Sequence, residues 1–227
     1  MWPREALDAR RREIGEVAYR LQYLNDPTAL EGAVFRPELL EAAMVNALPY
    51  DLPPIRIMGV DMAYGGEDYT AVVEVTRHGG SVYVVNGWQQ KFTSYTEKYR
   101  AIEGACRGRV VITENNGPQK DVYDGLRARG LHVIAFPTVK SKTAWAIETL
   151  QPLLEQGRLK ILDPRVKKEL MMFTGDETRH DDLVDATVMA CWYAATYLSD
   201  GVGRGAPMLN IKQVPMPSRL REVLNVH

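Results

Sequence analysis

The spacing of hydrophobic and polar residues changes several times along the chain, and each change predicts an element. Near-continuous apolar runs indicate strands buried on both faces, strict alternation indicates half-buried strands, and a three-to-four-residue period indicates helices. The predicted strands cover residues 55–60, 70–77, 81–88, 109–113, 132–136 and 159–162. The predicted helices cover residues 3–25, 37–47, 94–106, 119–129, 141–156, 164–173 and 179–198.

The order of these elements predicts an α/β fold. The first three strands follow one another with short turns, which is typical of an antiparallel meander. Strands and helices then alternate, which is typical of parallel strands joined by crossover helices. We therefore expect a mixed five-stranded sheet flanked by helices. Its first and fourth strands should lie side by side and run parallel.

Composition divides the chain into four predicted parts. They are a helical segment at 1–27, a proline-containing connector at 28–54, a compact domain at 55–198, and a Gly- and Pro-rich tail at 199–227, which we expect to be flexible or dependent on a partner. The chain has 227 residues, of which 45% are hydrophobic and 25% charged, so it can bury a sizeable core. With a net charge of −1, any binding to a polyanion must use a local patch.

Several classes of protein do not fit this sequence. Cys106 and Cys191 are far apart and are predicted to be reduced thiols in the core. The four histidines lack zinc-ligand spacing. No secretory signal is visible at the start, and the longest apolar run, residues 186–198, is too short to cross a bilayer. We expect a soluble protein that is neither secreted nor bound to a membrane.

Three aspartates, Asp181, Asp182 and Asp185, open the last predicted helix, whose remainder is almost wholly apolar. Aspartate is favoured at helix N-termini, because it caps free N–H groups and suits the helix dipole, so one such residue needs no further function. Three crowded carboxylates repel one another, and a positive charge nearby would offset that repulsion. The cluster therefore has two readings: helix capping or metal binding.

Two more carboxylates follow buried strands directly. Asp61 comes after the first strand and Glu114 after the fourth. Either residue alone could simply mark where a strand meets water. If the two strands are parallel neighbours, however, both side chains emerge at one edge of the sheet, where open α/β sheets place their sites. With the helix aspartates they form an oxygen-only set suited to Mg²⁺ or Mn²⁺, and two such ions can promote phosphodiester hydrolysis.

The motifs IMGVDMAYGGEDYTAVV, VVITENNG and RHDDLVDA, in this order, resemble those of the ribonuclease H-like nuclease superfamily. More narrowly, residues 55–198 resemble the C-terminal nuclease domain of the large terminase subunit of tailed phages. Residues 1–27 resemble the segment that joins the ATPase of that protein to its nuclease. The resemblance implies a Mg²⁺- or Mn²⁺-dependent endonuclease, with two ions, that cuts concatemeric viral DNA during packaging.

The resemblance also implies roles for individual residues. Asp61 is expected to bind metal at the end of the first strand, and Glu114 at the end of the fourth. Among the helix aspartates we favour Asp182 as the ligand, with Asp181 and Asp185 as close competitors. The residues with predicted auxiliary or DNA-contacting roles are Asp68, Lys140, Lys142 and His180. Lys142 has two possible roles beyond that of a solvated lysine: contact with the DNA backbone, or compensation of the site's negative charge.

The implied partners are double-stranded DNA, an ATPase motor, the portal and the small terminase subunit, in the cytoplasm of the host cell during virus assembly. The sequence contains no G-x-x-x-x-G-K-[ST] phosphate loop, so the motor is absent from these 227 residues. Three other functions stay open: a packaging module with little cleavage of its own, a Holliday-junction-resolvase-like nuclease, and an actin- or sugar-kinase-like nucleotide-binding fold.

Overall fold

The computed structural model describes residues 3–24, 32–51, 55–62, 69–117, 119–175 and 181–198. Its helices are α1 (Arg4–Ile14), α2 (Glu16–Tyr23), α3 (Pro37–Ala43), α4 (Tyr95–Cys106), α5 (Gln119–Ala128), α6 (Lys142–Glu155), α7 (Pro164–Met172) and α8 (Asp182–Tyr197). Its strands are β1 (Ile57–Asp61), β2 (Thr70–His78), β3 (Ser81–Gln90), β4 (Val110–Glu114), β5 (His132–Phe136) and β6 (Leu159–Ile161).

The strands form one mixed sheet in the order β5-β4-β1-β2-β3-β6. The β1, β2 and β3 strands make the predicted antiparallel meander. The β4 strand lies beside β1 and runs parallel to it, as predicted, and β5 continues the parallel half. The sheet has six strands rather than five because the short β6 strand pairs with β3 in parallel at the far edge. Leu159 and Ile161 are fully buried there, which holds this short strand in place.

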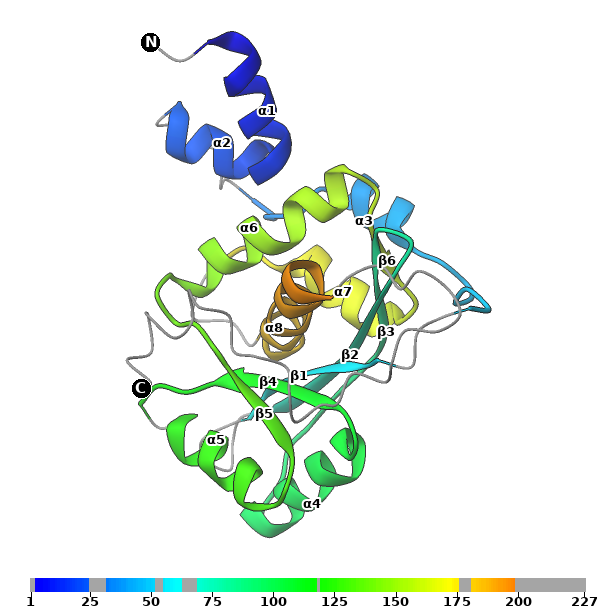
Figure 1. Ribbon diagram of the computed structural model, residues 1–227, viewed down its shortest axis with the longest axis vertical. Helices are drawn as coiled ribbons and strands as arrows, with labels where there is room; N and C mark the ends of the chain where they lie inside the picture. Colours follow the sequence, from blue (N-terminus) through cyan, green and yellow to red (C-terminus); the bar gives the residue numbers. More distant parts are fainter. Residues whose placement is uncertain are drawn as a thin grey trace.

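Helices cover both faces of the sheet (Figure 1). The α6, α7 and α8 helices lie on one face, and α4 and α5 lie on the other. The alternation of side chains along β1 serves both layers: Ile57 joins the core beneath α8, whereas Met58 and Val60 join the core beneath α4 and α5. Because both faces of β1 are buried, its sequence is a continuous apolar run.

The α8 helix packs very close to β1. A side chain at Gly59 would place its Cβ 1.8 Å from the carbonyl oxygen of Ala186. Glycine at this position therefore lets the backbone of α8 approach the strand directly. Because Gly59 is two residues before Asp61, the same contact brings the start of α8 near the carboxyl end of β1.

The predicted single helix at residues 3–25 is wrong in one respect, since two helices, α1 and α2, meet at Gly15. Gly15 has a φ of +81°, a conformation that favours glycine and breaks the helical path. Both helices contact α6: the backbone N–H of Glu16 donates to the carboxylate of Glu155, and the side chain of Gln156 donates to the carbonyl of Arg12.

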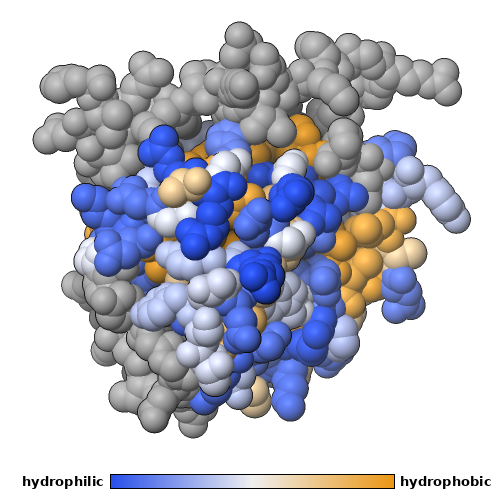
Figure 2. Space-filling view, turned by 90° about the horizontal axis from the view of Figure 1, so that it is seen from below, coloured by the Kyte–Doolittle hydropathy of each residue, from blue (hydrophilic) through white to orange (hydrophobic). Residues whose placement is uncertain are grey.

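The surface seen from below, beyond α4 and α5, is mainly hydrophilic where it is described (Figure 2). Hydrophobic residues gather in a smaller area towards one side of that view. Within the described ranges, no helix is long and apolar enough to span a membrane. Cys106 and Cys191 are buried and unpaired, as predicted. The tail at residues 199–227 lies outside the described residues.

Candidate metal site

Asp61 and Glu114 are the last residues of two neighbouring parallel strands. Ile57 pairs with Val110 and Gly59 with Ile112, so the same register, carried two residues further, sets Asp61 beside Glu114. Side chains two residues apart in a strand point to the same face. Both carboxylates therefore lie on the face of the sheet that α8 covers.

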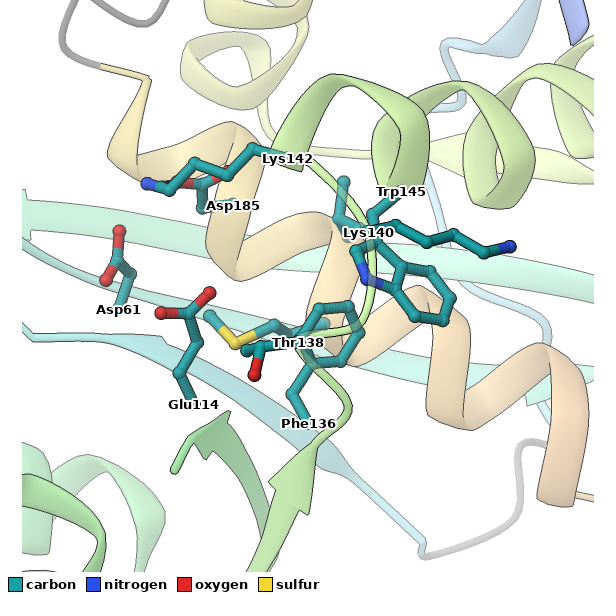
Figure 3. A pocket seen from close by; sticks show the side chains of 10 residues that line it. Asp61, Glu114, Phe136, Thr138, Lys140, Lys142, Trp145 and Asp185 are labelled. Atoms are coloured by element: carbon teal, nitrogen blue, oxygen red, sulfur yellow. Dashed lines mark hydrogen bonds and ion pairs between the residues drawn. The ribbon is translucent and has the colours of Figure 1, made fainter. Parts of the chain in front are cut away.

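The α8 helix adds a third carboxylate from its first turn. Asp185 directly precedes Ala186, the residue that contacts β1 at Gly59. Its side chain is 11% exposed. Figure 3 shows Asp61, Glu114 and Asp185 around one pocket. The pocket is lined by Asp61, Glu114, Phe136, Thr138, Lys140, Lys142, Trp145, Asp185, Val188 and Met189.

Lys142 brings positive charge to this pocket from the first turn of α6. The N-terminus of α6 is fixed by Ser141, whose hydroxyl accepts a hydrogen bond from the N–H of Ala144 at 3.2 Å. The ammonium of Lys142 is in direct contact with a carboxylate oxygen of Asp185. Although burial disfavours the ammonium, the charges of Asp185, Asp61 and Asp181 together raise the pKa of Lys142.

Asp185 and Glu114 are poorly solvated, and Asp185 also lies near the charges of other carboxylates. Burial raises the pKa of Asp185 well above its ordinary value, and the nearby charge of Asp61 raises it further, while Lys142 opposes both effects. Burial also raises the pKa of Glu114, again opposed by Lys142. Desolvated carboxylates of this kind are stabilised by additional positive charge.

This donor set fits a hard divalent cation in its chemistry, because the three carboxylates supply only oxygen ligands. Within the described part of the chain, however, no group of three or more His, Cys, Asp or Glu side chains is close enough to hold a metal ion as it stands. Lys142 contacts Asp185 in this arrangement. A cation bound by all three carboxylates would therefore have to compete with that ammonium group.

The other predicted site residues lie in different places. Asp182 is buried, with 8% of its surface exposed, and it does not line the pocket. Asp181 lies at the N-cap position of α8. Lys140 points away from the carboxylates in Figure 3; it pairs with Glu148 and lies over the ring of Trp145. Two predicted auxiliary residues lie outside the described residues: Asp68 and His180.

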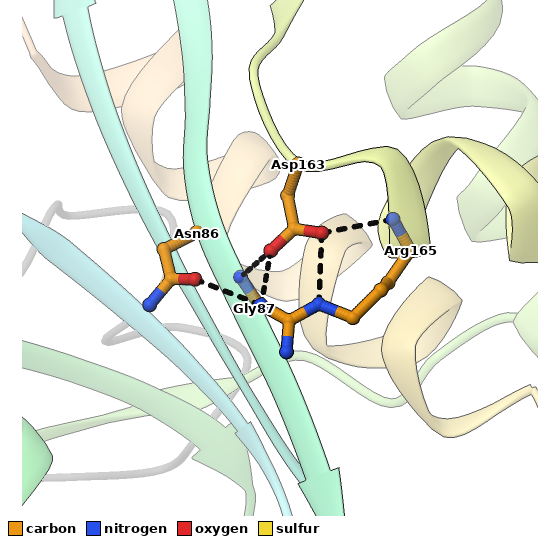
Figure 4. A network of polar contacts seen from close by, with 4 residues as sticks. All are labelled: Asn86, Gly87, Asp163 and Arg165. Carbon is orange, nitrogen blue, oxygen red and sulfur yellow. Dashed lines mark hydrogen bonds and ion pairs between the residues drawn. The ribbon is translucent and has the colours of Figure 1, made fainter.

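Another buried carboxylate, absent from the sequence predictions, lies at the start of α7. Asp163 accepts hydrogen bonds from the N–H of Gly87 at 2.9 Å and from the N–H of Arg165 at 2.8 Å. The guanidinium of Arg165 donates two more, at 3.0 and 2.6 Å, and also reaches Asn86 (Figure 4). Although burial opposes it, this bonding lowers the pKa of Asp163. The Asp-Pro pair at this helix start is the sequence signal that predicts such a cap.

Comparison with solved structures identifies the class of fold. The large terminase nuclease of thermophilic phage G20c, solved with bound magnesium, has a TM-score of 0.57 and 16% identity; the match covers 71% of this chain and 97% of that one. The nuclease domain of the Thermus phage P74-26 large terminase also has a TM-score of 0.57 and 16% identity, covering 73% and 98%. The mixed α/β fold is thus the ribonuclease H-like fold of terminase nucleases.

A longer protein, the large terminase of another thermophilic bacteriophage in complex with ATP-gamma-S, matches with a TM-score of 0.63 at 16% identity. That match covers 83% of this chain but 52% of the longer one. A comparison with curated proteins gave no significant match. The family model described as the terminase RNaseH-like domain matches residues 58–193, which is more than half of the chain. The protein belongs to this family.

Proposed function

We propose that this protein is a metal-dependent endonuclease that cuts concatemeric viral DNA during genome packaging. The observation that carries the proposal is the convergence of Asp61, Glu114 and Asp185 on one pocket from β1, β4 and α8. Membership of the terminase RNaseH-like family supports a nuclease of genome packaging. The structures of the G20c nuclease solved with magnesium, zinc and cobalt support a divalent cation as the cofactor.

The proposed metal ligands are Asp61, Glu114 and Asp185, and the proposed ions are two Mg²⁺ or Mn²⁺. When bound, such ions activate a water molecule and stabilise the leaving oxygen of the phosphodiester. Asp185 takes the place that the sequence assigned first to Asp182, because Asp185 lines the pocket and Asp182 does not. Asp182 and Asp181 stay as alternatives for the experiment to test.

The protein's own groups would prepare this site in three ways. Burial of Asp185 and Glu114 removes water that would otherwise compensate their charge. The strand ends fix Asp61 and Glu114 on rigid elements of the sheet. Lys142 offsets part of the negative charge and, by its position in the pocket wall, is available to contact a DNA phosphate.

We propose that the protein works beside an ATPase motor, with double-stranded DNA as substrate and with the portal and small subunit of a terminase as partners, in the host cell during virus assembly. The longer large terminase solved with ATP-gamma-S, of which the match covers 52%, supports the motor as a partner. Residues 1–27 are then the connector to the motor, residues 28–54 lead into the nuclease domain at 55–198, and residues 199–227 form a tail.

The experiment compares plasmid nicking in Mn²⁺ by the parent protein and by Asp61→Ala and Glu114→Ala variants. We expect both variants to lose cleavage by about 100-fold or more, since losing even an indirect partner of a metal ligand costs about 10–100-fold. Glu103→Ala is the control, because Glu103 is a partly exposed residue of α4 that pairs with Arg107 and does not line the pocket. Nicking by both site variants at the parent's rate would refute the site.

Two further measurements separate the alternative functions. Anomalous scattering from crystals soaked in Mn²⁺ counts the ions and identifies their ligands. Cleavage of branched DNA in preference to linear DNA would favour a resolvase-like nuclease. A protein that binds Mn²⁺ but cuts neither substrate without an added motor would favour the packaging module.

A further inference from the structure

The start of α8 is capped by a residue of another helix. Asp181 occupies the N-cap position, but its side chain makes no capping hydrogen bond. The N–H groups of Leu183 and Val184, which an N-cap side chain would ordinarily satisfy, donate instead to one oxygen of Glu169 at 2.7 and 3.2 Å. Asp181 therefore does not cap α8 with its side chain, as the helix-capping explanation of the aspartates would require. Glu169 of α7 caps the helix in its place.

Glu169 can hold α8 in place because α7 is itself firmly attached to the sheet. Asp163 caps α7 and accepts the N–H of Gly87 in β3, while Arg165 closes the network (Figure 4). The two elements also pack tightly, since a Cβ at Gly87 would lie 2.6 Å from a methyl group of Val166. A connected path thus runs from β3 through α7 to the first turn of α8.

The capped residues are the immediate neighbours of the pocket. Val184 directly precedes Asp185, and the N–H of Asp185 donates to the carbonyl of Asp181 at 3.0 Å, which closes the first turn. Any change in the path of Leu183 and Val184 therefore moves the Asp185 carboxylate relative to Asp61 and Glu114. Glu169 itself does not line the pocket, so it reaches the site through the backbone of α8.

We propose that Glu169 is a positioning residue: its side chain fixes the first turn of α8 and thereby sets Asp185 for metal binding. This inference rests on the proposed function, in which Asp185 is a metal ligand. This role requires a side chain long enough to carry an acceptor oxygen from α7 to the N–H groups of Leu183 and Val184. We expect the negative charge of Glu169 to matter less than the length of its side chain, because burial and the nearby charge of Asp181 raise the pKa of Glu169 and oppose the effect of the two capping hydrogen bonds, which lower it.

Two substitutions at Glu169 separate the effect of side-chain length from the effect of charge. Glu169→Gln keeps the length and an acceptor oxygen but removes the charge, whereas Glu169→Asp keeps the charge and shortens the side chain by one methylene. Calorimetric titration of the whole chain with Mn²⁺ gives the affinity. We expect Glu169→Asp to bind Mn²⁺ about tenfold more weakly, as is usual when the partner of a ligand is lost, and Glu169→Gln to stay within about threefold of the parent.

Glu41→Gln is the matched control, because Glu41 also contacts α7, through Lys167, but belongs to the separate helix α3. We expect its Mn²⁺ affinity to equal that of the parent. If Glu169→Asp binds like the parent, or if Glu169→Gln binds as weakly as Glu169→Asp, the positioning role is overturned. Parent-like binding by Glu169→Asp would mean that the length of the side chain is unimportant. Weak binding by Glu169→Gln would mean that its charge is the important property.

Amide hydrogen exchange tests the capping bonds without metal. The N–H groups of Leu183 and Val184 should exchange about tenfold faster in Glu169→Asp than in the parent, and at the parent's rate in Glu169→Gln. Unchanged exchange in Glu169→Asp would overturn the inference. If the parent protein binds no Mn²⁺, the proposed function fails, whereas the exchange rates still decide whether Glu169 holds the start of α8.

Discussion

Two helices on the same face of the sheet begin with buried aspartates, and their surroundings differ sharply. At the start of α7, Asp163 receives hydrogen bonds from two backbone N–H groups and from a guanidinium, which lower its pKa. In the first turn of α8, Asp185 contacts Lys142, and its burial and the nearby charges of Asp61 and Asp181 raise its pKa. The Asp163 carboxylate is thus surrounded by hydrogen-bond donors, whereas the Asp185 carboxylate has one cationic partner and other carboxylates nearby.

The difference gives a physical criterion for distinguishing a structural carboxylate, such as Asp163, from a proposed metal ligand, such as Asp185. A buried charge that stabilises a fold is surrounded by donors, as Asp163 is. A buried charge that the fold leaves crowded by others costs stability, and proteins keep such arrangements where a ligand completes them. Because both aspartates begin helices, sequence position alone does not distinguish them. Their partners, which come from distant segments, do.

The largest expected effect concerns which aspartate of α8 serves the site. Asp185→Asn should lower DNA cleavage in Mn²⁺ by about 100-fold or more, because it removes a proposed metal ligand. Asp182→Asn should keep cleavage within about tenfold of the parent, since Asp182 lies outside the pocket. Plasmid nicking measures both. If Asp182→Asn lowers cleavage more than Asp185→Asn does, Asp182 is the better candidate for the metal ligand, and the comparison of Asp185 with Asp163 no longer separates a metal ligand from a structural carboxylate.

The next effect concerns Asp163. Asp163→Asn should lower the free energy of unfolding by about 2 kcal/mol near neutral pH, because the charge-assisted bonds from Arg165 are weakened. The folded pKa of Asp163 lies below the unfolded value, so its stabilisation is present above about pH 3.9 and is lost as the pH falls through the folded pKa. Urea unfolding at about pH 7 and about pH 3 should therefore show a difference between parent and variant that shrinks in acid. A difference independent of pH would contradict the assignment.

The smallest effect concerns Lys142. Lys142→Gln should bind Mn²⁺ about threefold more tightly, because a partly exposed ion pair with Asp185 is worth up to about 1 kcal/mol and the cation must replace it. Lys140→Gln, whose parent side chain pairs with Glu148, serves as the control. Titration calorimetry is the measurement. Weaker binding by Lys142→Gln would mean that the ammonium supports the metal site and does not compete with it.

The sequence by itself determined the elements and the two strand-end carboxylates. Apolar runs mark β1 and β4 because these strands are buried on both faces, and alternation with a Gly-Gly turn marks the β2–β3 hairpin. Asp61 and Glu114 could be predicted to lie together because strand order and parallel direction follow from the order of elements. These features depend on residues that are close in the sequence.

Tertiary structure alone decided the rest. The α8 helix is apolar on most sides, so its periodicity does not reveal which face meets the sheet. Which of Asp182 and Asp185 lines the pocket depends on the contact of Ala186 with Gly59. The cap supplied by Glu169 joins residues on separate helices and leaves no local motif. Packing between distant segments therefore set the orientation of the acidic helix, whereas local patterns set where that helix begins.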